Sequence, residues 1–303
     1  MYRFVALLLV AALLLVAAAA AAPPRVVATI RTGIAPCGVA VAAGKVWVAT
    51  TTSSTVESID PRRNRVVGRP IRVGSRPCGL TAGAGSLWVD GFGTNTIERI
   101  NPRTRRVVAR IRVGTQPYDV LYAFGAVWST DYGSNRVSRI DPRRNRVVAR
   151  ISVPGGPGGL GVADGSLWVG NVSGDAVYRI DPATNRTTRV PVGRANPAWL
   201  ATRDDQVWVG SPMGNYAARI DPETNEVVAT LQIPGGPADG SVGPDGLVWM
   251  GLLNDRRIVR IDPASNRVVD SIRVGAGPFV VARALGDMWA PSWRGAAVWR
   301  LRP

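Results

Sequence analysis

Histidine is absent from this chain of 303 residues, and lysine occurs only at Lys45. The absence of histidine excludes Ser-His-Asp and Cys-His nucleophilic systems as well as the usual zinc sites. Acid-base chemistry would therefore fall to carboxylates or tyrosine. Arginine supplies almost all of the positive charge, and the net charge of +16 bears on solubility and anionic partners rather than on the fold.

Long apolar runs are confined to the N-terminus. Residues 1–22 carry one charge at Arg3, then an apolar run, then six alanines, which is typical of a secretory signal. We expect cleavage within residues 20–22, because small residues crowd that end and no charged stop follows closely. The alternative is an uncleaved anchor, since residues 4–22 are uncharged and long enough to span a bilayer. We therefore expect a secreted or extracytoplasmic protein whose remainder is soluble.

Seven tryptophans recur at steps of 40 or 41 residues. A period in the forties that also repeats β-branched runs, glycine turns and one aromatic anchor is typical of a propeller blade. The sequence therefore predicts an all-β, seven-bladed β-propeller with four antiparallel strands per blade, forming one domain over residues 25–303. The tryptophans, which we expect to lie in the core, are Trp47, Trp88, Trp128, Trp168, Trp208, Trp249 and Trp289.

The second repeat shows how each unit divides into strands, here called a to d. The four expected strands are residues 79–82, 86–89, 96–100 and 107–113. The turn between c and d is written Asp-Pro-x-x-Asn in most repeats, as at Asp141 to Asn145. Aspartate accepts bonds from turn amides, proline presets φ, and asparagine tolerates the left-handed conformation. The second repeat departs from this pattern with Asn101 and Arg105.

The two ends of the propeller sequence complement one another. The last repeat stops where its c-to-d turn should begin, so it lacks an outer strand, while residues 26–31 match strand d. Pairing residues 26–31 with residues 297–301 would close the ring and remove an open sheet edge.

The segment Asn135 to Pro142, followed by Asn145 to Ala149, resembles the YVTN-type β-propeller repeat. The wider group includes the streptogramin B (virginiamycin B) lyases, and the resemblance covers residues 25–303. In those lyases, catalysis is associated with histidine and with a glutamate beside a magnesium ion in the central cavity. Because this chain has no histidine, that catalytic pattern cannot be carried over to any of its positions.

Candidate binding residues are sought where the repeats disagree, because a residue needed only for packing should recur. Propellers commonly present their d-to-a and b-to-c loops on one face, where aromatic and acidic side chains would form a shaped funnel. The alternative is that these side chains plug the entrance and satisfy local loops. The d-to-a candidates are Tyr118, Asp119, Trp199, Asp239 and Phe279, and the b-to-c candidates are Asp90, Phe92, Asp131, Tyr132, Asn171 and Trp293.

Asp119 and Asp239 belong to the third and sixth repeats, nearly opposite one another in a seven-membered ring. We therefore expect them to flank a ligand or water rather than to chelate one cation. Carboxylate and carbonyl oxygens would suit calcium or magnesium, but no dense ligand motif is present, and no cofactor or metal is predicted. If the protein is an enzyme, its acid-base candidates are Asp119, Asp239, Tyr118 and Tyr132.

Cys37 and Cys78 occupy the same place in consecutive repeats, each within Pro-Cys-Gly. An exported protein meets oxidising conditions in which a disulfide can form. Packed sheets lie about 10 Å apart, whereas a disulfide needs Cα atoms about 4.4 to 6.8 Å apart. A bridge therefore forms only if the inner strands converge near the axis, and two free core cysteines are the alternative.

The opposite face is expected to be basic over three consecutive repeats. This patch could attract an anionic envelope polymer or membrane headgroups, although solvated turn residues are the commoner explanation. Nucleic acid is not expected, because aromatic residues are not interleaved with the arginines. The patch comprises Arg62, Arg63, Arg65, Arg103, Arg105, Arg106, Arg143, Arg144 and Arg146.

Two functions are consistent with these features. The first, which we favour, is an exported, monomeric, non-catalytic propeller that binds a small molecule, polysaccharide or protein in the funnel. The second is a lyase-like or metal-assisted enzyme that uses carboxylate and tyrosine groups in the same funnel. A propeller fold alone does not decide between them, because it is a scaffold for many functions.

Overall fold

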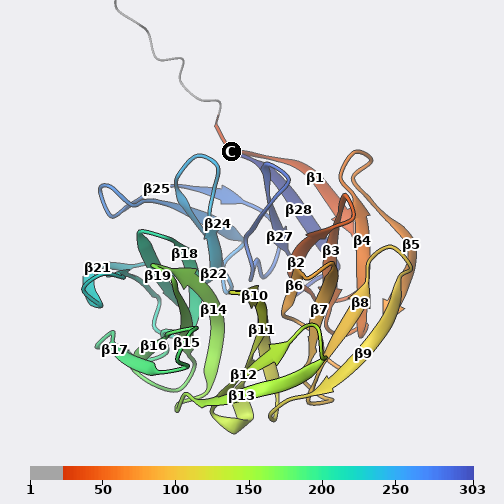
Figure 1. The fold of residues 1–303 in the computed structure, drawn as a ribbon. Helices are drawn as coiled ribbons and strands as arrows, with labels where there is room; N and C mark the ends of the chain where they lie inside the picture. The colour runs from red at the N-terminus through yellow and green to blue at the C-terminus, as the bar shows by residue number, and fades with distance from the viewer. Residues whose placement is uncertain (1–22) are drawn as a thin grey trace, which may run out of the picture.

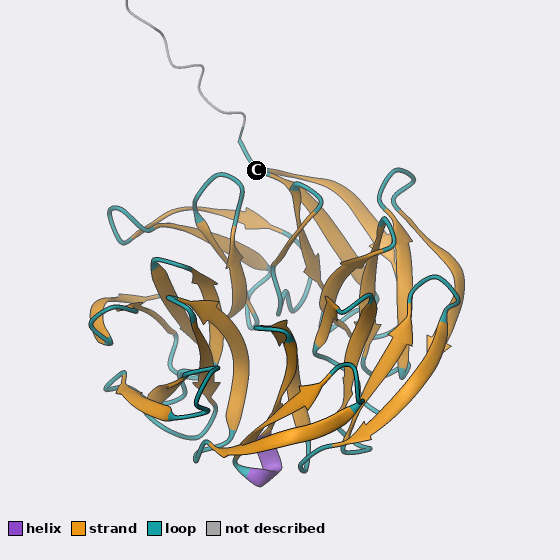
Figure 2. Ribbon diagram, viewed as in Figure 1, coloured by secondary structure: helices purple, strands orange, loops and turns teal. Residues whose placement is uncertain are grey.

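The computed structural model describes residues 23–303, so the expected leader at residues 1–22 lies outside the described part. Seven four-stranded antiparallel sheets surround a central axis as the blades of a propeller (Figures 1 and 2). The predicted fold is therefore confirmed. The only helical element among the described residues is the short 3-10 turn η1 (Tyr132–Ser134), and none there is long and apolar enough to cross a membrane.

Each blade runs from strand a at the axis to strand d at the periphery. Blades 1 to 6 follow the chain in order, and blade 7 combines the two chain ends. The strands are β2 (Pro36–Ala42), β3 (Lys45–Thr50), β4 (Thr55–Asp60) and β5 (Arg65–Arg72) in blade 1; β6 (Leu80–Gly83), β7 (Ser86–Gly91), β8 (Thr96–Asn101) and β9 (Arg106–Arg112) in blade 2; β10 (Pro117–Ala123), β11 (Ala126–Asp131), β12 (Arg136–Asp141) and β13 (Arg146–Ser152) in blade 3; β14 (Pro157–Ala163), β15 (Ser166–Asn171), β16 (Ala176–Ile180) and β17 (Thr187–Pro191) in blade 4; β18 (Trp199–Arg203), β19 (Gln206–Ser211), β20 (Tyr216–Asp221) and β21 (Glu226–Gln232) in blade 5; β22 (Pro237–Val242), β23 (Val248–Leu252), β24 (Arg257–Asp262) and β25 (Arg267–Arg273) in blade 6; and β26 (Ala282–Ala284), β27 (Asp287–Pro291), β28 (Ala297–Arg302) and β1 (Arg25–Arg31) in blade 7.

The N-terminal strand completes the last blade, as predicted. Strand β1 pairs antiparallel with β28, with Val26 opposite Leu301 and Arg31 opposite Ala297. Figure 1 shows β1 beside β28, with the C-terminus nearby. The pairing removes the open edge that a three-stranded blade would leave.

The repeated tryptophans are core residues in every blade, each at most 1% exposed. In blade 2 the indole Nε1 of Trp88 donates to the carbonyl oxygen of Gly83 at 3.0 Å, which fixes the a-to-b turn. Burying one such ring removes roughly 150 to 250 Å² from water. The repeat spacing is therefore set by a packing requirement that each blade meets separately.

An arginine on strand c links most blades to the next one. In blade 3 the Arg139 guanidinium lies 4.9 Å from the Trp128 ring centroid. It donates to the carbonyl oxygen of Pro182 at 2.7 Å and to Asn185 Oδ1 at 3.1 Å, both in the c-to-d turn of blade 4. The same pair of turn contacts is made by Arg99, Arg179, Arg219 and Arg300.

The junction of blades 1 and 2 makes this link in reverse. Strand c of blade 1 carries Ser58 in place of the arginine, and the blade 2 turn carries Arg105 in place of asparagine. Arg105 reaches back, donating to Ser58 Oγ at 2.7 Å and stacking 5.0 Å from the Trp47 centroid. Asn101 replaces the turn aspartate by accepting the amide of Arg103 at 2.9 Å. The two departures therefore preserve the same link with exchanged partners.

Candidate functional site

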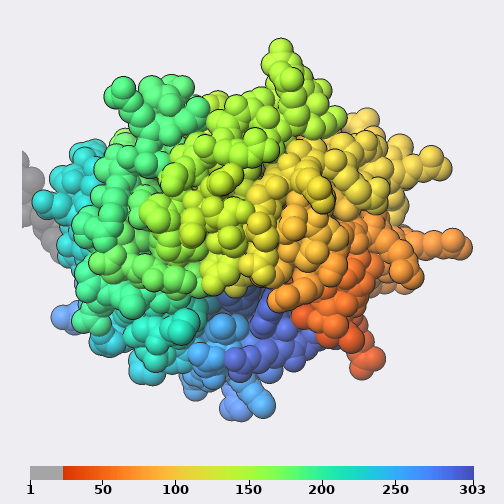
Figure 3. Space-filling model, turned by 90° about the horizontal axis from the view of Figure 1, so that it is seen from below, coloured from red at the N-terminus to blue at the C-terminus, as the bar shows by residue number. Residues whose placement is uncertain are grey.

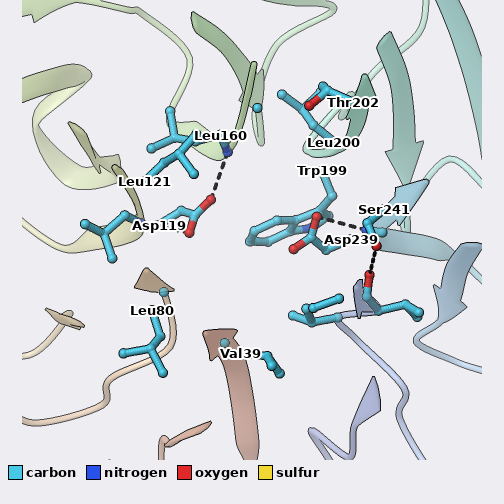
Figure 4. A pocket seen from close by; sticks show the side chains of 18 of the residues that line it. Val39, Leu80, Asp119, Leu121, Leu160, Trp199, Leu200, Thr202, Asp239 and Ser241 are labelled. Carbon is cyan, nitrogen blue, oxygen red and sulfur yellow. Dashed lines mark hydrogen bonds between the residues drawn. The ribbon is translucent and has the colours of Figure 1, made fainter. Parts of the chain in front are cut away.

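The seven inner strands surround a cavity of about 520 Å³ on the propeller axis, called here the inner cavity. Figure 4 looks into it and shows aliphatic side chains such as Leu80 and Leu160 around two carboxyl groups. Its volume lies within the usual range of small-molecule sites. The mouth of the inner cavity is lined by Arg203, Asp204 and Arg283, which are exposed at a-to-b turns.

An aromatic layer, formed by Tyr118, Trp199 and Phe279, closes the inner cavity at the d-to-a end. The Trp199 centroid lies 5.2 Å from that of Tyr118 and 4.6 Å from that of Phe279, with the rings packed edge to face. Trp199 and Phe279 are only 5% and 6% exposed. At this level the expected funnel is therefore plugged, which is the alternative that the sequence left open.

Small residues in neighbouring blades make room for the large side chains near the axis. A Cβ atom on Gly79 would lie 2.8 Å from the Cα atom of Asp119 in the next blade. On Gly159 it would lie 3.1 Å from the Trp199 ring. Each of these large inner residues thus depends on a glycine in the preceding blade.

A disulfide joins Cys37 of blade 1 to Cys78 of blade 2, with Cα atoms 5.0 Å apart. The inner strands do converge here, because the Gly38 amide donates to the Cys78 carbonyl at 2.9 Å. Asp90 holds the same loop by accepting the amides of Cys78 at 2.6 Å and Gly79 at 2.9 Å. The cysteines therefore help to close the d-to-a end beside the aromatic layer.

Asp119 and Asp239 face the inner cavity from opposite sides (Figure 4). The Asp119 carboxylate accepts the amide of Val120 at 2.8 Å and that of Leu160, in the next blade, also at 2.8 Å. Asp239 accepts the amide of Gly240 at 2.9 Å. Neutral amides therefore orient both carboxyl groups, leaving each with part of its surface on the cavity.

Burial makes both carboxyl groups unusually basic. It raises the pKa of Asp119 to about 7 against the opposing effect of its amide bonds. The pKa of Asp239 is raised well above its usual range, first by burial and then by the negative charge of Asp119. Burial, with a smaller contribution from Asp119, also raises the pKa of Asp90. The inner cavity therefore has a field that favours positive charge.

A second, smaller cavity of about 220 Å³ lies beyond the aromatic layer on the d-to-a side. This outer cup is lined by Arg76, Phe92, Tyr118, Tyr132 and Trp293, among others. Arg76, which sequence reasoning missed, places its guanidinium 4.6 Å from the Phe92 centroid. In the sequence, Arg76 could have been found from its position directly before the loop proline, Pro77. In the structure its φ is +57°.

The structure divides the predicted site residues between these two cavities. Asp119, Trp199, Asp239 and Phe279 line the inner cavity, Phe92, Tyr132 and Trp293 line the outer cup, and Tyr118 borders both. Of the acid-base candidates, Asp119, Asp239 and Tyr118 thus border the inner cavity, whereas Tyr132 lies on the other side of the aromatic layer.

Three predicted b-to-c residues line neither cavity, namely Asp90, Asp131 and Asn171. Asp131 is fully buried and accepts the Ser138 hydroxyl at 2.6 Å. Asn171 is 2% exposed and accepts the Gly174 amide at 2.7 Å. These side chains accept hydrogen bonds from neighbouring loop and strand groups, and neither cavity exposes them to a ligand.

The predicted basic patch needs one correction. Arg105 is not a free turn residue, because it is bonded to Ser58 and stacked on Trp47. The other eight arginines of the patch are exposed. Sequence reasoning placed Arg105 with them because its replacement of the turn asparagine does not by itself reveal the link to Ser58 in the preceding blade.

The residues of the inner cavity do not fit the magnesium site that the family resemblance implies. Within residues 23–303, no three acidic or cysteine side chains gather as a metal site would require. Both oxygens of Asp119 already accept main-chain amides. Chemistry in this cavity therefore rests on the two carboxyl groups.

A family model described as the virginiamycin B lyase family matches residues 68–303. The chain belongs to the virginiamycin B lyase family. None of the curated proteins compared with the chain by sequence matches it.

Solved structures with the same fold include lyases of this family. A streptogramin B lyase structure has a TM-score of 0.79 and 18% identity, covering 89% of this chain and 94% of its own. The selenomethionine-substituted virginiamycin B lyase from Staphylococcus aureus has a TM-score of 0.81 and 18% identity, with coverage of 93% and 100%. A catalytically inactive histidine-to-alanine variant of the S. aureus lyase, with quinupristin, has a TM-score of 0.77, 18% identity and coverage of 90% and 96%. At this identity the likeness establishes the fold alone.

Proposed function

We propose that this member of the virginiamycin B lyase family is a non-catalytic binding protein that holds a small organic cation between Asp119 and Asp239. The observation that carries the proposal is a pair of carboxyl groups facing one cavity whose lining arginines, Arg203 and Arg283, lie at its mouth and form no ion pair with either group. Among residues 23–303, no arginine or lysine contributes to the pKa of either group. Buried charges are normally paired, and here a ligand would supply the partner.

A protonated amine fits this cavity better than a neutral or anionic ligand does. In its absence the raised pKa values favour protonation of both carboxyl groups. An ammonium group would replace those protons and form charge-assisted hydrogen bonds to the carboxylates. Aliphatic walls from Leu80, Leu160 and Leu200 would cover the carbon skeleton.

The absence of histidine supports binding rather than turnover. The inactive variant of the S. aureus lyase differs by a histidine-to-alanine change, and this chain has no histidine at any position. The aromatic layer also separates Tyr132 from Asp119 and Asp239, which argues against an acid-base pair of Tyr132 with either carboxyl group.

One observation favours the enzymatic alternative. A carboxyl group with a pKa of about 7, as at Asp119, has the acidity that general acid-base catalysis at neutral pH requires. Under this alternative, the mature protein would convert quinupristin, the compound present in the S. aureus lyase structure, and Asp119→Asn would lose turnover while retaining binding. We expect no turnover, measured by mass spectrometry of the reaction mixture.

Binding is tested by calorimetric titration with a series of diamines and with a diol of matched length as a neutral control. We expect the diamines to bind and the diol not to bind. Asp119→Asn and Asp239→Asn should each weaken diamine binding at least tenfold. Asp255→Asn, which removes the same charge at an exposed loop, should leave the affinity unchanged. Equal affinities in all four proteins would refute the proposal.

Export is part of the same proposal. A disulfide between Cys37 and Cys78 supports it, because disulfides persist in oxidising compartments. The apolar, alanine-rich residues 1–22 support it independently. The test is the N-terminal sequence of the protein recovered from the envelope or medium, which should begin after residues 20–22.

A further inference from the structure

The outermost strands of blades 1 to 3 carry arginine at matching positions. Strands β5, β9 and β13 follow one another around the edge of the propeller (Figure 1). Five residues after the start of each c-to-d turn stand Arg65, Arg106 and Arg146, all exposed. Further along the strands stand Arg69, Arg110 and Arg150, also exposed. Arg110 and Arg150 share a register position, opposite Glu98 and Ser138, whereas Arg69 lies at a bulge in blade 1. These six residues form what we call the arginine wall.

The other blades provide an internal comparison for the arginine wall. In blade 5 the two positions hold Glu226 and Thr230. Blades 4 and 6 keep an arginine in the first row, at Arg186 and Arg267. In blade 4 the register position of Arg110 and Arg150 is taken by Arg189, which is paired with Asp175. The blade fold therefore does not require arginine at these positions.

The arginine wall is largely free of acidic partners. Of its six members, only Arg110 has an ion pair within the described chain, to Glu98 at 3.0 Å. Like charges gathered on one surface repel one another and lower the stability of the compact state. Such an arrangement is stabilised when anions lie across several strands at once.

We propose that the arginine wall binds a linear anionic polysaccharide. The guanidinium group pairs with planar carboxylates and with sulfates through two parallel hydrogen bonds. Between the two rows the exposed apolar side chains are Val108 and Val148, which offer no aromatic platform for nucleic-acid bases. The inference does not depend on the inner cavity.

The shape of this side favours a flexible chain over a membrane. Figure 3 views the side that includes β9 and β13 and shows a convex surface. A flat bilayer would touch such a surface along one blade, whereas a linear polymer can follow the curve across all three. Binding through many arginines should fall steeply with salt, because each contact releases counterions.

Immobilised heparin, a linear polysaccharide that carries carboxylates and sulfates, is the probe. The wall variant is Arg106→Glu with Arg146→Glu. The matched control is Arg186→Glu with Arg267→Glu, which makes the same charge change at the same strand position in blades 4 and 6. We expect the wall variant to lose at least tenfold in affinity at constant salt and to show a shallower salt dependence, while the control loses less than threefold.

Equal losses in the two variants would overturn the proposal, because they would show that net charge alone governs binding. Tighter binding of the wild type to duplex DNA or to vesicles with anionic headgroups than to heparin would overturn it as well. A second wall variant, Arg69→Gln with Arg150→Gln, tests the proposal if the first variant unfolds. It removes two arginines further along the strands without adding negative charge.

Discussion

The interfaces between blades and the axis of this propeller follow opposite rules. At the interfaces the same tryptophan, turn and arginine link recur from blade to blade, as with Trp128 and Arg139. At the axis the second residue after the loop proline is Gly79, Asp119, Trp199 or Asp239, depending on the blade. Blade interfaces repeat one geometry, whereas side chains at the axis share one space and cannot all be large. Side chains that break the repeat therefore identify the part of the molecule available for function.

The largest effect is expected from a buried tryptophan at an interface between blades. Trp168→Ala should lower the free energy of unfolding by about 3 to 5 kcal/mol, because the ring is fully buried and would leave a cavity. Phe92→Ala, in the partly exposed outer cup, should cost roughly 1 kcal/mol. Urea unfolding followed by circular dichroism measures both, and equal costs would remove the distinction between repeated and variable aromatic residues.

The acidic pair at the axis should give stability an unusual pH dependence. Because the pKa of Asp119 is about 7 in the folded protein and near 3.8 when unfolded, the folded state binds more protons between these values. Stability should therefore fall as pH rises from 4 to 7, by an amount on the order of a few kcal/mol, since one pKa unit corresponds to about 1.4 kcal/mol.

The measurement is the free energy of unfolding of wild type and Asp119→Asn across pH 4 to 7. The variant should lose the part of the decline that Asp119 contributes, because its amide does not titrate, while Asp239 and Asp90 keep their share. The exposed turn carboxyl of Asp141 has a lowered pKa, so Asp141→Asn should leave the decline in place. Identical profiles for wild type and Asp119→Asn would show that the Asp119 carboxyl is not buried as described.

A smaller effect is expected where the link between blades runs in reverse. Arg105→Ala should cost about 1 to 3 kcal/mol, the range for hydrogen bonds to a charged group, because it leaves Ser58 and the Arg69 carbonyl without their donor. Arg105→Asn combined with Ser58→Arg should recover most of the loss by restoring the link found in other blades. A double variant no more stable than Arg105→Ala would contradict the exchange of partners.

The smallest effect is expected at a neighbouring exposed arginine. Arg103→Ala should change the free energy of unfolding by less than about 0.5 kcal/mol, as surface substitutions usually do. It is the matched control for Arg105→Ala, since both lie in the same turn. Thermal unfolding of the two variants side by side measures the difference, which would vanish if Arg105 were solvated like Arg103.

The sequence predicted the contacts between blades well and the arrangement of side chains at the axis poorly, for a physical reason. Trp88 and the Asp141 turn recur at a fixed period, so their neighbours follow from the repeat. The aromatic layer brings Tyr118, Trp199 and Phe279 together from three blades, and no period relates them. Which side chains fill the axis and which line a cavity depends on how seven different residues share one space, which a single sequence does not specify.

The most direct test of the cation site is the affinity of a diamine that stays fully protonated between pH 6 and 8. If binding requires Asp119 to lose a proton, a pKa of about 7 predicts that affinity rises at least tenfold across this range in the wild type, with Asp239 adding to the rise. In Asp119→Asn the affinity should be weak and its rise with pH smaller. A wild-type affinity that stays constant or falls from pH 6 to 8 would contradict the account.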